Sequence, residues 1–480
     1  MLARLKQLPA TAWVTFQHAT EQALWLLLFV IQAPILGPKA FGLISLVMVF
    51  VGFCEFVVAS VGTELLLSIR DIQPRHYSTV TVTCVAISTV LGGALFFAAD
   101  ALARIFQDAE LPNVARALAF LPILSCLSAA PSAAVKRAMN FRGTALRGIS
   151  SVSVAGSVSL GLTLSGAGVW ALVVQALLQR LVSVVVLWQI ATVRPSAQWS
   201  WPCLKSLGPM AGKLTVSSVM SWSSGQLPRL ILGWWLGIVD LGLFALASRL
   251  IDLLTQIAIW PKITVARVYL RTLTDDLPAL RAAAEKMFGQ LSLLCFPLCA
   301  GGALVIPPLF HFWLDPRWYG AIAPSQWLLL TGIPSVTFYC SAAVLLAVNR
   351  QGTEALVEST QTLSSAVVAA AVGPFGFLPV TAALALRPWL LVLLPIVCMV
   401  RTAHLTWSNI VGPQLRPLLA AAAMGACIWA LRLGLEDRLP GAWLIALLIV
   451  TGVLVYAALS SLLMPDLLSQ LIRRDVRFAR

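Results

Sequence analysis

Long apolar stretches recur along almost the whole chain, and they constrain its fold more than any other feature. A transmembrane helix needs about 20 mostly apolar residues. The 480-residue sequence, divided at charged and Gly/Pro-rich breaks, contains fourteen such stretches. They cover residues 12–35, 41–65, 78–99, 114–134, 148–165, 168–191, 210–233, 239–261, 287–308, 323–348, 354–374, 379–400, 415–433 and 441–464. The sequence therefore predicts an all-α polytopic membrane protein with about 14 transmembrane helices.

The composition excludes an ordinary soluble protein. Apolar residues make up 59% of the chain and charged residues 11%, whereas soluble domains have about 45–50% and 25%. The 9 cysteines and 4 histidines are dispersed, without the spacing that metal sites require. We therefore expect no metal site and no disulfide framework.

The basic residues are distributed unevenly among the loops. With the N-terminus in the cytoplasm, most of the 33 lysines and arginines fall on the cytoplasmic side, as the positive-inside rule requires. This asymmetry predicts that both termini are cytoplasmic. It also accounts for most of the net charge of +14, so we expect no nucleic-acid partner.

Two phrases occur twice in the same order. Residues 36–46 read LGPKAFGLISL and residues 236–246 read LGIVDLGLFAL, while residues 132–144 read SAAVKRAMNFRGT and residues 341–353 read SAAVLLAVNRQGT. One match could arise by chance in a chain rich in Leu, Ala and Gly. Two matches, each separated by six predicted helices, indicate an internal duplication with parallel repeats.

The duplication divides the chain into three parts. We predict an N-terminal six-helix lobe over 1–200, a C-terminal six-helix lobe over 201–410, and two further helices with a basic cytoplasmic tail over 411–480. The repeated glycines Gly37, Gly42, Gly237 and Gly242 are expected to permit positive φ angles and close helix approach. Their predicted role is packing and not ligand binding.

Ionisable residues within the apolar stretches are candidates for a functional site. A charge at the bilayer centre costs about 2.5–3.5 kcal/mol on insertion scales, so such residues usually face a cavity or a partner. The candidates are His18, Glu21, Glu55, Arg180, Arg229, Arg249 and Asp252, with the polar neighbour Gln226.

Local context separates the three arginines. Arg229 follows Pro228, and because proline disrupts the helical hydrogen bonds, we expect Arg229 to line a cavity. For Arg180, cavity lining and interhelical hydrogen bonding are equally consistent with the sequence. Arg249 and Asp252 are three residues apart, so a local ion pair is the alternative to a binding role.

Arginine carries a forked set of donors that suits phosphate. Uncompensated arginines near the middle of both halves therefore suggest an anionic substrate. Glu21, Glu55 and Asp252 are the candidate coupling residues, and His18 and Gln226 the candidate polar cavity residues.

Beyond these patterns, the chain resembles the multidrug/oligosaccharidyl-lipid/polysaccharide exporter superfamily, and within it the Wzx-like bacterial polysaccharide-repeat flippases. The resemblance extends from about residue 12 to residue 464. It rests on LGPKAFGLISLVMVF at 36–50, GAGVWALVVQ at 166–175 and PRLILGWWLGIVDLGLFALASRLIDL at 228–253.

The resemblance implies a transporter and not an enzyme. It implies a multi-pass protein of the bacterial inner membrane that moves a polyprenyl-diphosphate-linked oligosaccharide to the outer leaflet by alternating access through a cationic cavity, for exopolysaccharide or lipopolysaccharide biosynthesis. Arg180, Arg229 and Arg249 would bind the diphosphate. We expect no cofactor beyond a coupling ion, H⁺ or Na⁺, and we expect contacts with membrane lipids, a monomeric state and a polysaccharide polymerase or export machinery as partner.

Two alternatives stay open at this point. One is a cation-coupled drug or metabolite antiporter of the same superfamily, which would favour an acid-dominated cavity. The other is a membrane polysaccharide polymerase or ligase, which usually needs a large extracytoplasmic loop. The longest predicted outer loops, 100–113 and 309–322, are short, so the polymerase ranks third.

Overall fold

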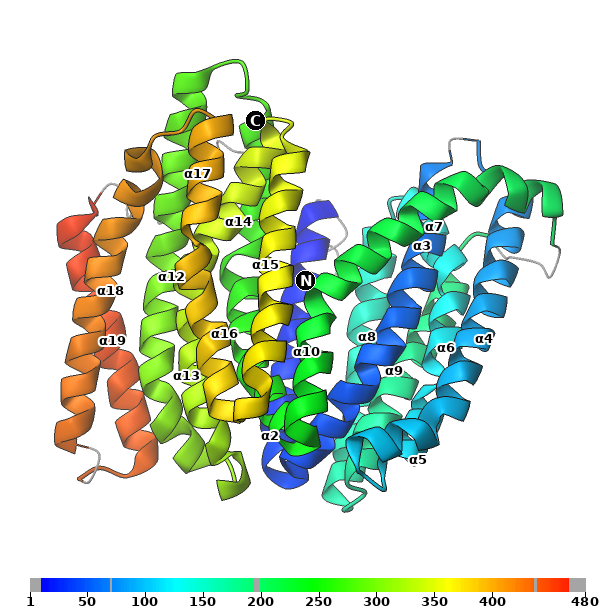
Figure 1. The fold of residues 1–480 in the computed structure, drawn as a ribbon, viewed down its shortest axis with the longest axis horizontal. Helices are drawn as coiled ribbons and strands as arrows, with labels where there is room; N and C mark the ends of the chain where they lie inside the picture. The colour runs from blue at the N-terminus through cyan, green and yellow to red at the C-terminus, as the bar shows by residue number, and fades with distance from the viewer. Residues whose placement is uncertain (1–9, 70, 194–198, 436–437, 466–480) are drawn as a thin grey trace, which may run out of the picture. The chain divides into compact units, whose positions relative to one another are not determined.

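The computed structural model describes residues 10–69, 71–193, 199–435 and 438–465. Within these residues the secondary structure is helical and contains no strand, so the predicted all-α fold class is confirmed. The chain forms two compact units, Met1–Gly242 and Leu243–Arg480. Figure 1 shows each of them as a bundle of long helices. The lobes predicted from the duplication, 1–200 and 201–410, are not tested by this division and stay a prediction.

The first unit contains α2 (Ala10–Cys54), η1 (Glu55–Ser60), α3 (Val61–Ser68), α4 (Pro74–Phe106), α5 (Leu111–Leu118), α6 (Leu121–Leu127), α7 (Ala129–Arg137), α8 (Phe141–Leu164), α9 (Val169–Ile190) and the first part of α10 (Trp201–Ala258). The second unit contains the rest of α10, α11 (Trp260–Arg271), α12 (Leu277–Trp313), η2 (Pro316–Ala321), α13 (Ile322–Leu330), α14 (Gly332–Ala347), α15 (Gln351–Val372), η3 (Gly373–Phe375), α16 (Phe377–Leu391), α17 (Leu393–Thr402), α18 (Trp407–Leu435) and α19 (Gly441–Leu463).

Among the described residues, 11 helices are long and apolar enough to cross a membrane, or 12 if the bent pair Pro316–Leu330 and Gly332–Ala347 forms one span. The chain is therefore a multi-pass membrane protein. Two of the candidate spans contain the kinks of α2 and α10, at Gly37 and Gly237, where two helices meet without a loop. The predicted count of fourteen separates each of these into two spans and stays a prediction.

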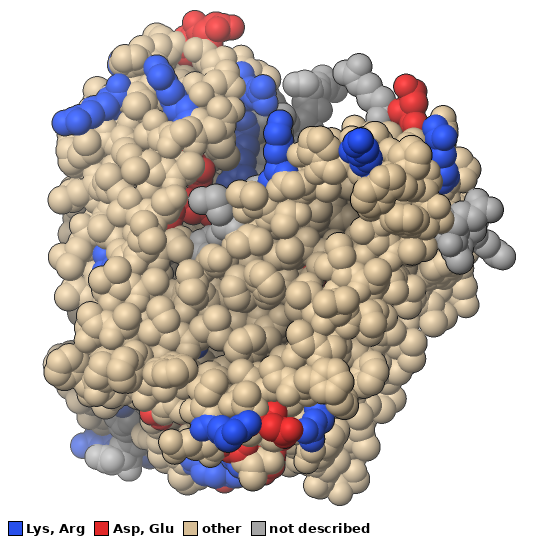
Figure 2. Space-filling view, turned by 45° about the vertical axis from the view of Figure 1, so that its right-hand side comes forward, with Lys and Arg blue, Asp and Glu red and all other residues tan. Residues whose placement is uncertain are grey.

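The surface agrees with a membrane environment. Large apolar side chains are exposed on the helices, for example Phe97 with 82% and Leu462 with 78% of its surface accessible. Figure 2 shows that on one face the charged side chains gather toward the ends of the helices, with a largely uncharged zone between them. A soluble protein rarely exposes so much contiguous apolar surface.

The first duplicated phrase forms a close helix crossing within the first unit. Gly37 and Gly237 have φ angles of 72° and 81°, as expected, whereas Gly42 and Gly242 do not have a positive φ. A Cβ atom on Gly42 would lie 1.9 Å from the carbonyl oxygen of Ile238, and one on Gly242 would lie 1.9 Å from that of Pro38. The expected close approach is confirmed, and it is reciprocal, because each copy of the phrase contacts the other through matching positions.

The second duplicated phrase forms two equivalent helix ends. The Asn140 amide donates to the carbonyl of Val135 at the end of α7, and the Arg350 amide donates to that of Leu345 at the end of α14. This six-residue closure is the Schellman motif. Its left-handed residues are Met139 and Asn349. The aligned phrases pair Asn140 with Asn349, so the two helix ends are equivalent with a shift of one residue relative to the sequence alignment.

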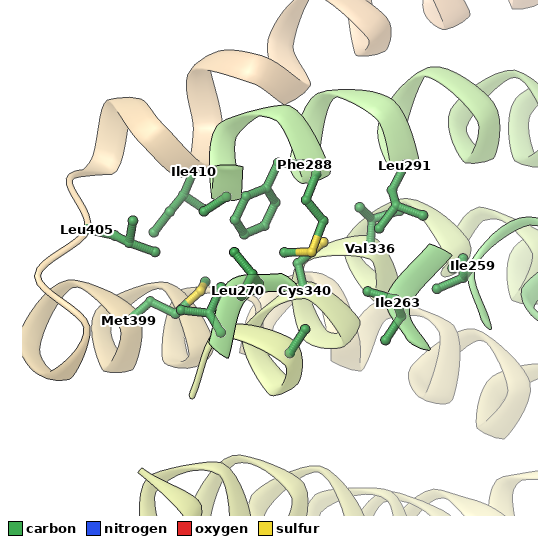
Figure 3. Packing of buried hydrophobic residues seen from close by; sticks show 14 of the residues in the cluster. Ile259, Ile263, Leu270, Phe288, Leu291, Val336, Cys340, Met399, Leu405 and Ile410 are labelled. Atoms are coloured by element: carbon green, nitrogen blue, oxygen red, sulfur yellow. The ribbon is translucent and has the colours of Figure 1, made fainter. Parts of the chain in front are cut away.

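Each unit has its own apolar core. In the second unit, Phe288 of α12 and Cys340 of α14 pack with Met399 of α17 and Ile410 of α18 (Figure 3). In the first unit, the second half of α2 packs on α5 and α9. Membrane helices associate through such packing because lipid provides no hydrophobic driving force between them.

Candidate functional site

A polar cleft lies entirely within the first unit. Its cavity volume is about 410 Å³, and its walls come from α2, η1, α3, α6, α7, α9 and α10. Three of the predicted site residues, Glu55, Arg180 and Gln226, line it. The fold therefore gathers charged and polar side chains from segments that are distant in the sequence.

An ion pair marks one end of this cleft. The Nη2 atom of Arg180 on α9 lies 2.6 Å from Oε2 of Glu55, whose other oxygen accepts a hydrogen bond from the Ser125 hydroxyl of α6. The arginine side chain is 48% exposed and the glutamate side chain 16%. Both side chains line the cleft, and the arginine is the more exposed of the two.

Glu55 also begins a π-helical turn, Glu55–Ser60, between α2 and α3. Such wide turns inside α-helices occur frequently at functional sites. The turn contributes Glu55, Phe56 and Ala59 to the cleft wall. The backbone irregularity and the charged pair therefore coincide.

This pairing corrects one hypothesis from the sequence. We expected an uncompensated Arg180, but Glu55 neutralises it across 125 positions of the chain. The charged residues in the cleft lining are Glu55, Glu64, Lys136 and Arg180, so the lining is balanced in formal charge.

A second group of charges lies between α2 and α8. Glu21 accepts a hydrogen bond from Gln17 at 2.8 Å. The absence of a side chain at Gly148 leaves space for Glu21, because a Cβ atom at Gly148 would lie 1.6 Å from the Glu21 Oε1 atom. Arg147 lies within electrostatic reach of Glu21. Its buried Nε atom has no hydrogen-bond partner in the described part of the chain. The neighbouring His18 is exposed.

The remaining predicted residues lie on α10. Arg229 donates to Gln226 at 3.4 Å, which places it next to the cleft residue although it does not line the cleft itself. Arg249 and Asp252 belong to the second unit and are half-buried, each with further interactions. The structure thus brings Glu55, Arg180 and Gln226 together, and it leaves Arg249 and Asp252 in a separate unit.

Sequence reasoning missed several cleft residues. Ser125, Ser128, Ser132 and Lys136 line the cleft from α6 and α7. Their spacing of three or four positions places them on one helical face, and this spacing can be read from the sequence. Trp222 on α10 also lines the cleft.

Comparisons with known proteins fit this fold. Residues 31–323 match the model of the family described as polysaccharide biosynthesis protein. The succinoglycan biosynthesis transport protein ExoT of Rhizobium meliloti (strain 1021) is 26% identical over 229 residues, which cover 48% of this chain and 46% of ExoT. The chain thus matches about half the length of this curated relative.

Two solved structures share the fold. The lipid II flippase MurJ in an inward closed conformation superposes with a TM-score of 0.74 at 14% identity, covering 96% of this chain and 99% of MurJ. An inward-facing multidrug resistance MATE family transporter of the MOP superfamily gives a TM-score of 0.61 at 14% identity, covering 80% and 95%. These proteins are transporters and flippases and not enzymes, as expected. The chain belongs to the polysaccharide biosynthesis protein family.

Proposed function

We propose that this chain is a flippase for a polyprenyl-diphosphate-linked oligosaccharide. It would carry the headgroup from the cytoplasmic to the outer leaflet of the bacterial inner membrane, for exopolysaccharide or lipopolysaccharide biosynthesis. The observation that carries the proposal is the half-exposed Arg180 in a polar intramembrane cleft. A membrane protein keeps such a costly group where a polar ligand crosses.

The chemistry of the Arg180–Glu55 pair suits a diphosphate. A guanidinium binds phosphate through two parallel hydrogen bonds, and Arg180 already holds a carboxylate at 2.6 Å. The diphosphate would replace Glu55 as the partner of Arg180. Because the phosphates carry more charge than one carboxylate, the exchange favours the ligand.

The same exchange supplies a route to ion coupling. Glu55 that has lost Arg180 keeps only its hydrogen bond from Ser125, so a coupling cation would take the place of Arg180 as its partner. H⁺ or Na⁺ would then accompany the headgroup through alternating access. Glu21 and Asp252 are the further coupling candidates, and Arg229 and Arg249 the further diphosphate contacts.

The test is a leaflet-resolved assay of lipid-linked saccharides in cells that lack the chromosomal gene. Cells complemented with Arg180→Gln should trap the lipid-linked repeat on the cytoplasmic side, whereas the wild-type chain should restore export. The matched control is Arg116→Gln, because Arg116 forms an ion pair of the same 2.6 Å length with Asp100 outside the cleft. Normal export by Arg180→Gln at wild-type abundance would reject the role of Arg180.

The likeness to a MATE family transporter supports one alternative, a drug or metabolite antiporter. Two carboxylates in the cleft, Glu55 and Glu64, are compatible with cation binding. The same deletion strain separates the two functions. Drug hypersensitivity with undisturbed saccharide export would favour the antiporter.

A further inference from the structure

The wall of the cleft beyond the Arg180–Glu55 pair is built from neutral polar groups. Ser125, Ser128 and Ser132 follow one face of α6 and α7, and Lys136 continues the same row. At 1.5 Å per residue, this row extends for about 16 Å. A diphosphate bound at Arg180 would contact only one end of it.

The hydroxyls in this row differ in what they already bind. Ser125 donates to Glu55, and Ser128 donates to the carbonyl of Ser125 at 2.6 Å. The side chains of Ser132 and Lys136 have no hydrogen bond or ion pair within the described residues. The row therefore offers free donors and acceptors at the end opposite to Arg180.

Helix α10 contributes an aromatic ring and an amide to the cleft lining. Trp222 and Gln226 are four residues apart and share a helical face, and both line the cleft. The indole is held edge-to-face against Phe53 with ring centroids 5.0 Å apart. Its Nε1 atom is buried and has no hydrogen-bond partner in the described residues, so Trp222 contributes packing surface and no internal hydrogen bond.

A lining that combines hydroxyls, an amide, carboxylates and an aromatic ring suits carbohydrate. Sugar hydroxyls exchange hydrogen bonds with serine, glutamine and glutamate, and the apolar C–H face of a pyranose packs against an aromatic ring. A hydrophobic drug would leave the Ser132 hydroxyl unpaired, at a cost in binding free energy. The cavity volume of about 410 Å³ lies within the usual range of small-molecule sites, about 300–1,000 Å³.

We propose that this serine–tryptophan wall is a saccharide-recognition site that contacts the sugars next to the diphosphate and so selects the oligosaccharide. The inference rests on the proposed function, since it places the diphosphate at Arg180. Trp222 packs against a sugar ring, Ser132 hydrogen-bonds to its hydroxyls, and Lys136 contacts polar groups further along the glycan.

The experiment compares two lipids that bind to the purified full chain in nanodiscs. One is undecaprenyl diphosphate, and the other is the same lipid carrying galactose, glucose or N-acetylglucosamine. Trp222→Ala and Ser132→Ala should each reduce the binding affinity for at least one glycosylated lipid by about five- to tenfold, which corresponds to the loss of one aromatic or polar contact. Both variants should bind undecaprenyl diphosphate within about twofold of wild type.

Trp222→Phe is the matched control. It keeps an aromatic face and removes a donor that has no internal partner, so folding and binding of the glycosylated lipid should stay near wild type. The proposal is overturned if Trp222→Ala and Ser132→Ala reduce the affinity for both kinds of lipid equally, or if they reduce neither affinity. Failure of the wild-type chain to bind either lipid would overturn the proposed function, and this inference with it.

Discussion

Replacing Gly42 with alanine should destabilise the helix crossing in the first unit. The new Cβ atom would lie 1.9 Å from the carbonyl oxygen of Ile238, and a contact of 3.0 Å is already tighter than side chains normally make. The two helices must therefore separate by about 1 Å. Overpacking of this kind costs about 1–3 kcal/mol. Because the contacting atom belongs to the backbone and cannot rotate away, we expect Gly42→Ala to lower the free energy of unfolding by about 3 kcal/mol, the upper end of this range.

Alanine has a higher helix propensity than glycine, which raises the free energy of unfolding by about 1 kcal/mol. The expected net loss of unfolding free energy is therefore about 2 kcal/mol. Thermal unfolding in detergent can be followed with a thiol-reactive dye, because the free thiols Cys84 and Cys126 are buried in the same unit. The melting temperature should fall by about 2–4 °C. Gly93→Ala on α4 is the control, since nothing lies within 4 Å of its Cβ position, and it should not lower the melting temperature.

The reciprocal contact makes a sharper prediction for the double variant. Gly242→Ala creates the same overlap with the carbonyl of Pro38, so helices already separated by one substitution accommodate the second at lower cost. The double variant should therefore lose less stability than the sum of the single losses. A melting temperature for Gly42→Ala equal to that of wild type would refute the backbone contact.

Three further predictions concern single residues. Gln32→Leu should lower stability by about 1–3 kcal/mol, because the buried amide bonds Ser159 at 2.7 Å and Gln175 at 3.3 Å; an unchanged thermal unfolding curve would contradict this. Asp276→Ala should cost about 1 kcal/mol, because its carboxylate accepts from the first turn of α12 at 3.0 Å, and a variant with Asn at this position should restore most of the loss. Glu55→Gln should tighten binding of undecaprenyl diphosphate by about fivefold, the value of about 1 kcal/mol for a partly exposed ion pair; weaker binding in a calorimetric titration would argue against competition for Arg180.

Much of the fold was predictable because the membrane restricts it. A helix is the simplest way to satisfy backbone groups in lipid, so apolar length alone indicated the fold class. The glycine kinks were predictable because the phrase recurs with Gly37 and Gly237 at matching positions. The number of spans depends on whether α2 and α10, which continue through these kinks without a polar loop, are each counted as one span or as two.

The site was predictable residue by residue but not as an arrangement. Glu55 and Arg180 were evident as charges in apolar stretches, but their contact spans 125 positions and depends on how η1 and α9 pack. Arg147 was missed because the predicted span began at residue 148, whereas α8 begins at Phe141. A charge near a predicted helix end is easily assigned to a loop when the helix is longer than its apolar core.

The most direct test of the proposed function is translocation by the purified chain in liposomes. A labelled undecaprenyl-diphosphate glycan is placed in the inner leaflet, and its arrival outside is measured with an impermeant glycan-cleaving enzyme. We expect translocation that requires the protein and is abolished by Arg180→Glu but retained by Arg116→Glu. Equal translocation by Arg180→Glu and the wild-type chain, or none by the wild-type chain, would contradict the account.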